Sequence, residues 1–312
     1  MTTSLIDLIG NTPLVRLQHI GRGLSVPIFV KCEHLNPGGS VKDRLAKAII
    51  LDAEESGRLK PGMTLVEATA GNTGIGLALL AAARGYNLVC VMPEKMSVDK
   101  RLALTSMGAR VVVTPNAPLS SVDNFKNVAK RLAEENGWYL TDQFCNPVNV
   151  RTHEVTTGQE ILDQTRSNVG VFTAGAGIGG TISGVARRLK EQLADVKIVL
   201  ADPLGSSLAG LINTGVLGMD GSYAIEGIGA SEPPANLHCE QIDWAETVSD
   251  EESFAMVKRL IREEGLLVGG SSGTNVAVAL RIASSGKVKG PVVTILPDAW
   301  DRYRAKPWMQ NL

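Results

Sequence analysis

The chain alternates short apolar, β-branched runs with stretches whose apolar positions repeat at the helical spacing, which predicts strands and helices in alternation. In the first half, the predicted strands are 63–69, 88–92, 110–114 and 138–142, and the predicted helices are 75–84, 100–107 and 121–136. In the second half, the predicted strands are 169–173, 197–201 and 291–296, and helices are predicted at 181–192, from 249 to Gly265 and after Ser271–Ser272. This alternation indicates α/β architecture with parallel sheets that carry helices on both faces. A break near 146–151 divides the pattern into two domains.

Two local signals refine this pattern. Ser249 is followed three residues later by Glu252, which predicts a capping box at the start of a helix. The segment 205–223 carries five glycines and little periodicity, so we predict a long mobile loop there.

The composition narrows the class of protein. The chain has 312 residues, 44% of them hydrophobic, and a formal net charge of -1. This balance is typical of a globular protein and gives no electrostatic footprint for nucleic acid or an anionic membrane. The four cysteines and four histidines lie at no disulfide-framework or metal-ligand spacing, so we expect no bound metal. Neither a signal peptide nor a transmembrane run is recognisable, and a cytoplasmic protein is expected.

Glycine is the one composition value that stands out, with 33 residues, or about 11%, against roughly 7% in average proteins. Several of these glycines gather at the predicted starts of helices. The first such motif is Asn36-Pro-Gly-Gly-Ser-Val-Lys-Asp-Arg44, which places Lys42 in the first helical turn, with Ser40 and Asp43 able to cap. A cation is disfavoured at this end of the helix dipole. The position therefore suits a lysine that acts as a nucleophile, although a solvated surface lysine is the ordinary alternative.

The second motif, Glu67-Ala-Thr-Ala-Gly-Asn-Thr-Gly74, lies between a strand and a helix. Its glycines allow backbone N–H groups to converge on an anion, and Thr69, Asn72 and Thr73 add short side-chain donors. An ordinary tight turn explains one or two of these residues equally well.

The third motif, Gly175-Ala-Gly-Ile-Gly-Gly-Thr181, fits the dinucleotide pattern GxGxxG, and Asp202 ends the next predicted strand. Alone it favours a nicotinamide or flavin dehydrogenase, but Gly177–Thr181 could cradle a single phosphate just as well. The fourth motif, Gly269-Gly-Ser-Ser-Gly273, opens another helix and offers a hydroxyl to a ring nitrogen or an anion, or simply an N-cap. A reactive lysine with a phosphate cradle is what pyridoxal 5′-phosphate requires.

These four motifs, in this order, resemble the cysteine synthase/cystathionine β-synthase family of fold-type II pyridoxal-phosphate enzymes. The opening Ile9-Gly-Asn-Thr-Pro-Leu14 and the closing Leu296-Pro-Asp298 agree, so the resemblance covers essentially the whole chain. It implies a tryptophan synthase β-like fold of two domains, each with a mostly parallel sheet flanked by helices. The implied division is a smaller substrate-loop domain at 36–148 and a larger phosphate-binding domain formed by 1–35 and 149–312.

The resemblance assigns roles to residues of this sequence. Lys42 is implied to bind the cofactor aldehyde and to remove the substrate Cα proton, and Asn72 to contact the cofactor's 3′-oxygen. The cofactor phosphate is implied to bind Gly177, Ile178, Gly179, Gly180 and Thr181. Ser271 is implied to face the pyridine nitrogen, where a neutral hydroxyl does not enforce ring protonation. The implied substrate contacts are Thr69, Ala70, Gly71, Thr73, Gln143 and Gly227.

Some positions depart from the common family pattern. Ala70 stands where serine is usual, and Ile178 stands where threonine is common, so two hydroxyl groups are absent. Ala70, the segment Glu226-Gly-Ile-Gly229 and Leu296-Pro-Asp298 look most like the bacterial O-acetylserine-dependent cystathionine β-synthases.

The function implied is β-replacement on serine or O-acetylserine through an aminoacrylate intermediate, with homocysteine or sulfide as the incoming thiol. The product is then cystathionine or cysteine, and a homodimer is implied. Alternatives are an amine nucleophile that gives diaminopropionate, or serine/threonine dehydration. An NAD-dependent dehydrogenase, based on the GxGxxG pattern and Asp202, is a remote alternative because it leaves Lys42 and the other glycine motifs without a role.

Overall fold

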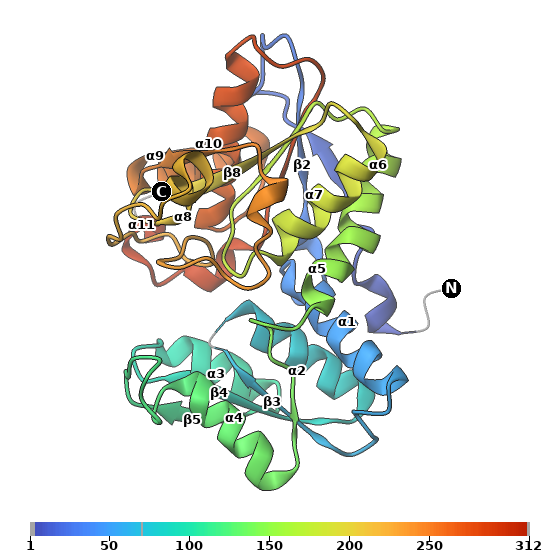
Figure 1. Ribbon diagram of the computed structural model, residues 1–312, viewed down its shortest axis with the longest axis vertical. Coiled ribbons are helices and arrows are strands. Elements are labelled where there is room, and N and C mark those ends of the chain that lie inside the picture. The colour runs from blue at the N-terminus through green and yellow to red at the C-terminus, as the bar shows by residue number, and fades with distance from the viewer. Residues whose placement is uncertain (1–3, 70, 311–312) are drawn as a thin grey trace. The chain divides into compact units, whose positions relative to one another are not determined.

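The computed structural model describes residues 4–69 and 71–310. The chain forms two compact units, the first from Met1–Gly10 and Asn36–Val148 and the second from Asn11–Leu35 and Asn149–Leu312. Each unit is an α/β assembly built around its own sheet (Figure 1).

The first unit contains a four-stranded, fully parallel sheet in the order β5-β4-β3-β6. Its strands are β3 (Thr64–Ala68), β4 (Asn87–Pro93), β5 (Arg110–Thr114) and β6 (Tyr139–Leu140). Its helices are η1 (Leu5–Leu8), α1 (Lys42–Glu55), α2 (Asn72–Arg84), α3 (Val98–Ser106) and α4 (Phe125–Asn136). Parallel strands joined by helices require crossovers, which is why the strand order differs from the chain order.

Alternation of side chains along β3 and β4 decides which helix covers which face of this sheet. Val66 and Val89 point to one face and pack with Val128 and Ala129 of α4. The helices α1 and α2 pack against each other, and α2 also packs on β4. The sheet is thus buried on both faces, as the near-continuous apolar strands predict.

The second unit contains a six-stranded sheet in the order β1-β2-β10-β7-β8-β9. Its strands are β1 (Leu14–Arg16), β2 (Ile28–Lys31), β7 (Val171–Ala174), β8 (Lys197–Pro203), β9 (Trp244–Val248) and β10 (Val292–Ile295). Only the edge strand β1 runs antiparallel to its neighbour, and the other pairs are parallel.

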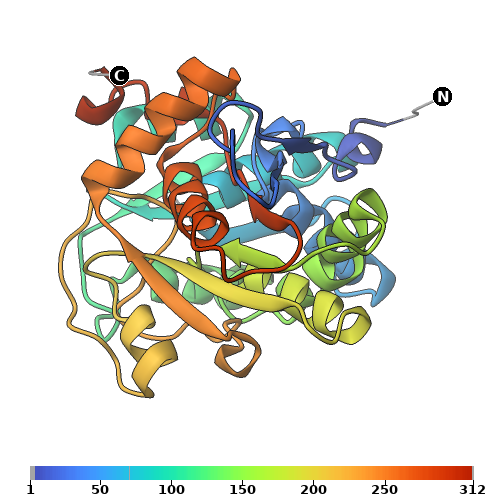
Figure 2. The ribbon, with the colours of Figure 1, turned by 90° about the horizontal axis from the view of Figure 1, so that it is seen from above.

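Helices cover both faces of this second sheet. The helical segments are η2 (Glu33–Leu35), α5 (Val148–Thr152), η3 (His153–Gly158), α6 (Gln159–Thr165), α7 (Gly180–Gln192), α8 (Leu208–Thr214), η4 (Cys239–Gln241), α9 (Asp250–Glu264), α10 (Gly270–Ser284), η5 (Trp300–Tyr303) and α11 (Pro307–Gln310). Figure 2 shows α9 and α10 on one side of the sheet and α6 and α7 on the other. Apolar residues of α10, such as Val276 and Ile282, share a core with Ile28, Val171 and Val199 of the strands.

The α/β class and the mostly parallel sheets predicted from the sequence are confirmed. The segment 205–223, predicted as a long mobile loop, is not all loop, because α8 forms within it. Backbone bonds from Gly218 N to Ser207 O and from Gly221 N to Gly205 O fold the segment back. Only half of the predicted capping box forms. Ser249 Oγ accepts the Glu252 N–H at 3.2 Å, but the Glu252 carboxylate binds Arg281 of α10 instead of the helix start.

In the described part of the chain, no helix is both long and apolar enough to cross a membrane. Within the same residues, no group of three or more His, Cys, Asp or Glu side chains is arranged to hold a metal ion.

Candidate functional site

Lys42 is the first residue of α1 and is half-buried. The Ser40 hydroxyl accepts the Lys42 N–H at 3.2 Å, so Ser40 serves one of the free donors at this helix end, as predicted. Asp43 does not cap the helix. Its Oδ2 accepts the Gly38 N–H at 2.5 Å and so fixes the turn that precedes the lysine.

This turn explains why the motif contains two glycines. A Cβ on Gly38 would lie within 3.0 Å of the Asp43 carboxylate, and Gly39 has a φ of 76°. Glycine is the residue that adopts such a backbone without strain. The two glycines therefore place Lys42 at the helix start.

The start of α1 packs closely on α2. A Cβ on Gly76 would lie 3.1 Å from both the Lys42 carbonyl oxygen and the Ala46 Cβ. Because Gly76 has no side chain, the second turn of α2 approaches the first turn of α1. Asn72, predicted to contact the cofactor, is the first residue of α2 in the same unit.

Two of the predicted substrate contacts are joined directly, although they lie 70 residues apart in the chain. The Thr73 hydroxyl donates to Gln143 Oε1 at 2.5 Å, and Gln143 Nε2 donates to the Ala68 carbonyl at 3.3 Å. Nearby, the Gly71 N–H points to Thr69 Oγ1 at 3.4 Å. Ala70 lies outside the described residues. Thr69, Gly71, Thr73 and Gln143 thus gather at the carboxyl end of β3.

A buried carboxyl group, which the sequence analysis did not single out, lies behind these residues. Glu67 in β3 is 1% exposed, and its Oε2 accepts the Thr141 hydroxyl and, at 3.1 Å, the Gln143 N–H. Burial raises the pKa of Glu67 to about 7, and the hydrogen bonds from Thr141 and Gln143 oppose that rise. Glu67 therefore fixes the backbone of Gln143. In the sequence, Glu67 was marked by its place two residues before Thr69, near the end of a predicted strand.

A cavity of about 250 Å³ opens beside the same residues in the first unit. Its lining combines Thr69 and Gln143 with apolar side chains and one exposed lysine; the other lining residues are Ala68, Pro93, Lys95, Met96, Phe125 and Phe144. The cavity therefore offers a polar end, an apolar wall and a cation.

The third glycine motif forms a tight loop before α7 in the second unit. Gly179 has a φ of 83°, and a Cβ there would lie within 3.0 Å of the Leu237 backbone. A Cβ on Gly177 would meet the Gly227 carbonyl within the same limit, so this loop and the loop carrying Gly227 lie against each other. Gly177 and Gly179 are therefore required because the backbone at Gly227 and Leu237 lies too close to leave room for a side chain.

This loop has the chemistry that a phosphate group needs. The N–H groups at the start of α7 have no acceptor within the helix, and the helix dipole favours an anion there. Thr181 adds a hydroxyl, and Ile178 supplies only its backbone N–H. A loop with N–H donors at a helix start, glycine at positions 177, 179 and 180 and a hydroxyl at Thr181 fits the phosphate of pyridoxal phosphate, and Gly177–Thr181 would hold it.

Ser271, predicted to face the cofactor ring, is the second residue of α10 and is 3% exposed. It lies in the second unit with the phosphate cradle. Asn275, one turn further along α10, fixes the loop before the cradle, because its Oδ1 accepts the Gly175 N–H at 2.7 Å. The same side chain donates from Nδ2 to the Ile295 carbonyl at 2.9 Å, which ties α10 to the end of β10.

Asp202 does not serve the dehydrogenase alternative. Its side chain is fully buried at the end of β8, and its Oδ2 accepts the Ala209 N–H at 2.8 Å. Burial raises the pKa of Asp202 to about 6. A carboxyl group turned into the protein cannot bind the ribose hydroxyls of a dinucleotide, so the GxGxxG pattern here lacks its acidic partner.

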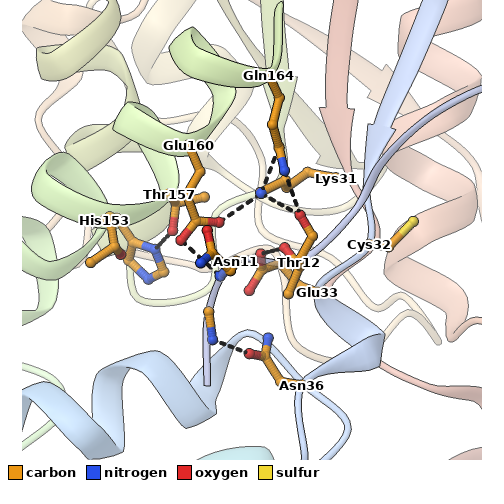
Figure 3. Close-up of polar contacts among 12 residues, drawn as sticks. Asn11, Thr12, Lys31, Cys32, Glu33, Asn36, His153, Thr157, Glu160 and Gln164 are labelled. Atoms are coloured by element: carbon orange, nitrogen blue, oxygen red, sulfur yellow. Dashed lines mark hydrogen bonds and ion pairs between the residues drawn. The ribbon is translucent and has the colours of Figure 1, made fainter. Parts of the chain in front are cut away.

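A buried polar network, also missed in the sequence, lies in the second unit (Figure 3). Lys31 of β2 is fully buried, and its Nζ donates to the Thr12 carbonyl, Glu160 Oε2 and Gln164 Oε1 at 2.7, 2.7 and 2.8 Å. These three acceptors compensate the burial of the ammonium group. The network ties α6 to β2.

Comparisons with known proteins agree with this arrangement. A family model described as pyridoxal-phosphate dependent enzyme matches residues 5–298. The chain is 44% identical over 309 residues to a cystathionine beta-synthase of Dictyostelium discoideum, covering 97% of this chain and 61% of that protein. It is 45% identical to the cystathionine beta-synthase of Rattus norvegicus, covering 97% of this chain and 54% of that protein. The chain thus spans a little over half of the length of these relatives.

Solved structures match over nearly their whole length. A crystal structure of an O-ureido-L-serine synthase has a TM-score of 0.91 at 37% identity and covers 100% of this chain and 96% of its own. The O-acetylserine dependent cystathionine beta-synthase of Helicobacter pylori has a TM-score of 0.88 at 38% identity and covers 98% of both chains.

Proposed function

Because the chain belongs to the family of pyridoxal-phosphate dependent enzymes, we propose that it catalyses β-replacement on L-serine or O-acetyl-L-serine with a thiol as nucleophile. The observation that carries this proposal is the gathering of Thr69, Thr73 and Gln143 at the end of β3, in the unit that begins its first long helix with Lys42. The relatives and solved structures reported above are named cystathionine beta-synthase or O-ureido-L-serine synthase, which supports this proposal.

Each site residue has a separate chemical role in this proposal. When bound, the cofactor supplies an electron sink for the pair released at the substrate Cα. The Lys42 Nζ takes the Cα proton, and Thr69, Thr73 and Gln143 hold the substrate carboxylate by N–H and O–H donors. The N–H groups of Gly177–Thr181 hold the phosphate, and the neutral Ser271 hydroxyl faces the ring nitrogen. The Cβ–O bond of the donor then breaks, and the oxygen leaves as acetate from O-acetyl-L-serine or as water from L-serine. A Cβ–S bond forms as the thiol loses its proton, and the Lys42 Nζ returns a proton to Cα.

The cavity next to Gln143 favours an organic thiol over sulfide. A volume of about 250 Å³ exceeds what sulfide needs, while its apolar wall of Met96, Phe125 and Phe144 suits methylene groups. The exposed Lys95 adds a cation for a carboxylate. These features support homocysteine as the nucleophile, because it carries both methylene groups and a carboxylate. The product would then be cystathionine.

The test is a matrix of donors and nucleophiles with the purified holoenzyme, read by the mass of the product. We expect O-acetyl-L-serine or L-serine with homocysteine to give cystathionine at a higher kcat/KM than sulfide gives cysteine. Lys95→Ala should raise the KM for homocysteine and leave the KM for sulfide unchanged. Equal use of both thiols would contradict the preference for an organic thiol, and no product from any pair would contradict the function.

A second candidate keeps the cofactor and changes the nucleophile. The structural match to an O-ureido-L-serine synthase, whose name describes an oxygen-linked product, favours it. Amines and hydroxylated ureas belong in the same matrix, together with a control lacking nucleophile that reveals dehydration. The homodimer and the cytoplasmic location expected from the sequence stay predictions.

A further inference from the structure

A fully buried histidine lies directly behind the phosphate cradle. His153 is 0% exposed, and its two ring nitrogens lie near two hydroxyl groups: Nδ1 is 2.9 Å from Thr157 Oγ1 and Nε2 is 3.2 Å from Thr181 Oγ1. Figure 3 shows the contact between His153 and Thr157. Thr181 is half-buried in the first turn of α7 and closes the cradle.

Small residues on α7 permit this contact. A Cβ on Gly184 would lie within 3.0 Å of the Val150 carbonyl and the His153 Cβ, and a Cβ on Gly180 would overlap Asn149. Glycines four residues apart lie on one helix face, so α7 approaches the helix that carries His153 along a smooth side. The His153 imidazole can therefore reach the hydroxyl of Thr181, the residue after Gly180.

The helix that carries His153 is irregular and firmly anchored. Residues His153–Gly158 form a π-helix between α5 and α6. π-Helices are rare in proteins, and those that occur are often found at functional sites. Beyond it, Glu160 and Gln164 bind the buried Lys31 Nζ (Figure 3). The anchor and the wider turn together determine where His153 and Thr157 lie.

We propose that His153 is a positioning residue that orients the Thr181 hydroxyl toward the cofactor phosphate. This inference rests on the proposed function, because it requires the phosphate to occupy the cradle formed by Gly177–Thr181.

The direction of the hydrogen bonds follows from donor counting. A phosphate dianion only accepts, and the Thr181 hydroxyl has one proton, so Thr181 donates to the phosphate. Its oxygen must then accept from His153 Nε2–H. In a neutral imidazole, a proton on Nε2 leaves a lone pair on Nδ1, which can accept the Thr157 hydroxyl proton. The two contacts fit the Nε2–H tautomer, which keeps the Thr181 proton aimed at the cradle.

The first experiment measures pyridoxal phosphate binding by the apoenzyme through the cofactor absorbance. We expect His153→Phe and Thr181→Val each to raise the Kd about 10-fold, as the loss of one hydrogen bond to a charged group predicts. The double variant should bind no more weakly than either single variant, because the histidine acts only through Thr181. Additive losses would overturn the proposal.

Two further variants separate positioning from structure. Thr157→Val should raise the Kd about threefold, because it removes the selection of the tautomer but leaves the imidazole in place. Thr156→Val is the matched control, since the Thr156 hydroxyl binds the Thr152 carbonyl instead, and its Kd should stay within twofold of wild type. Equal effects of both threonine variants would contradict the proposal.

Nitrogen NMR of the labelled holoenzyme provides a readout that does not depend on activity or on folding of the variants. We expect His153 as the Nε2–H tautomer, and the Nδ1–H tautomer would overturn the proposal. If wild-type apoenzyme failed to bind pyridoxal phosphate at all, the proposed function would fail instead, so the two failures are distinguishable.

Discussion

A carboxyl group with almost no contact with solvent lies in β3 behind the predicted substrate loop. Glu67 is 1% exposed, and burial raises its pKa to about 7 from an ordinary value of 4.5. The folded protein therefore binds more protons than the unfolded chain between these two pH values. Because stability falls with rising pH wherever the folded state holds the extra proton, Glu67 lowers stability as pH rises from about 4.5 to about 7.

Glu67→Gln should remove this dependence, because an amide can still accept from Thr141 and Gln143 without a buried charge. The free energy of unfolding of the variant, relative to wild type, should increase between pH 4.5 and pH 7 by roughly 1–3 kcal/mol and then stay constant. Urea unfolding of both proteins at several pH values measures this difference in the free energy of unfolding. A stability difference that does not change with pH would show that Glu67 ionises as in water.

Some site residues are predictable from the sequence because their type and motif reveal their chemistry. Lys42 and the glycines of the cradle belong to that group. Glu67 and His153 do not, because their partners are distant in sequence: Thr141 is 74 residues from Glu67, and Thr181 is 28 residues from His153. A buried acid next to a strand end, or a histidine within a helix, has no distinctive spacing.

The start of α9 shows how far a local motif determines an element. Ser249 caps the helix as predicted, with its Oγ accepting the Glu252 N–H. The Glu252 side chain turns instead to Arg281 on α10, and that tertiary partner could not be foreseen from the motif.

Ser249→Ala should therefore lower the free energy of unfolding by about 1 kcal/mol through the loss of the cap. Ser249→Asp should restore it, because aspartate caps equally well and its charge suits the helix N-terminus. Thermal unfolding of the three proteins measures the effect. Equal stability of Ser249→Ala and wild type would show that the cap adds nothing here.

The contact between α7 and the π-helix depends on the absence of a side chain at Gly184. A Cβ there would lie within 3.0 Å of the Val150 carbonyl, a backbone atom that cannot move aside alone. We expect Gly184→Ala to destabilise the protein by about 1–3 kcal/mol through overpacking.

Gly21→Ala is the matched control for this substitution. Its added Cβ would meet nothing closer than 3.6 Å, so its stability should stay within about 0.5 kcal/mol of wild type. Denaturant midpoints distinguish the two variants. A Gly184→Ala protein as stable as the control would contradict the close packing.

Element types were predictable where periodicity was strong, as in β5, α2 and α9. The strands β1, β2 and β9 were not identified, and α8 lies where a loop was expected. The glycines of segment 205–223 led to the prediction of a loop. Some of them instead make backbone hydrogen bonds, such as Gly221 N to Gly205 O, on either side of α8. The π-helix has no sequence signal of its own.

At the scale of the whole molecule, the residues assigned to one cofactor are distributed over both compact units. Lys42 and Asn72 belong to the first, and Gly177–Thr181 and Ser271 belong to the second. A ligand that binds the folded protein and not the unfolded chain stabilises the folded state by an amount that mass action determines.

Pyridoxal phosphate at 100 times its Kd should raise the free energy of unfolding of the apoenzyme by about 2.7 kcal/mol. Calorimetry should show a higher melting temperature for the holoenzyme than for the apoenzyme. Lys42→Ala should lose part of this increase, because the cofactor then binds without its covalent link. A melting temperature that does not respond to pyridoxal phosphate would contradict the assignment of these residues to the cofactor.

The central claim is that Lys42 carries the cofactor of this enzyme. Borohydride reduction fixes a pyridoxyl group permanently to the amine that holds it, and peptide mass mapping then locates that amine. We expect a single modified peptide that contains Lys42, and no pyridoxyl group on the Lys42→Ala protein. A pyridoxyl group on any other lysine, or on none, would contradict the assignment of Lys42.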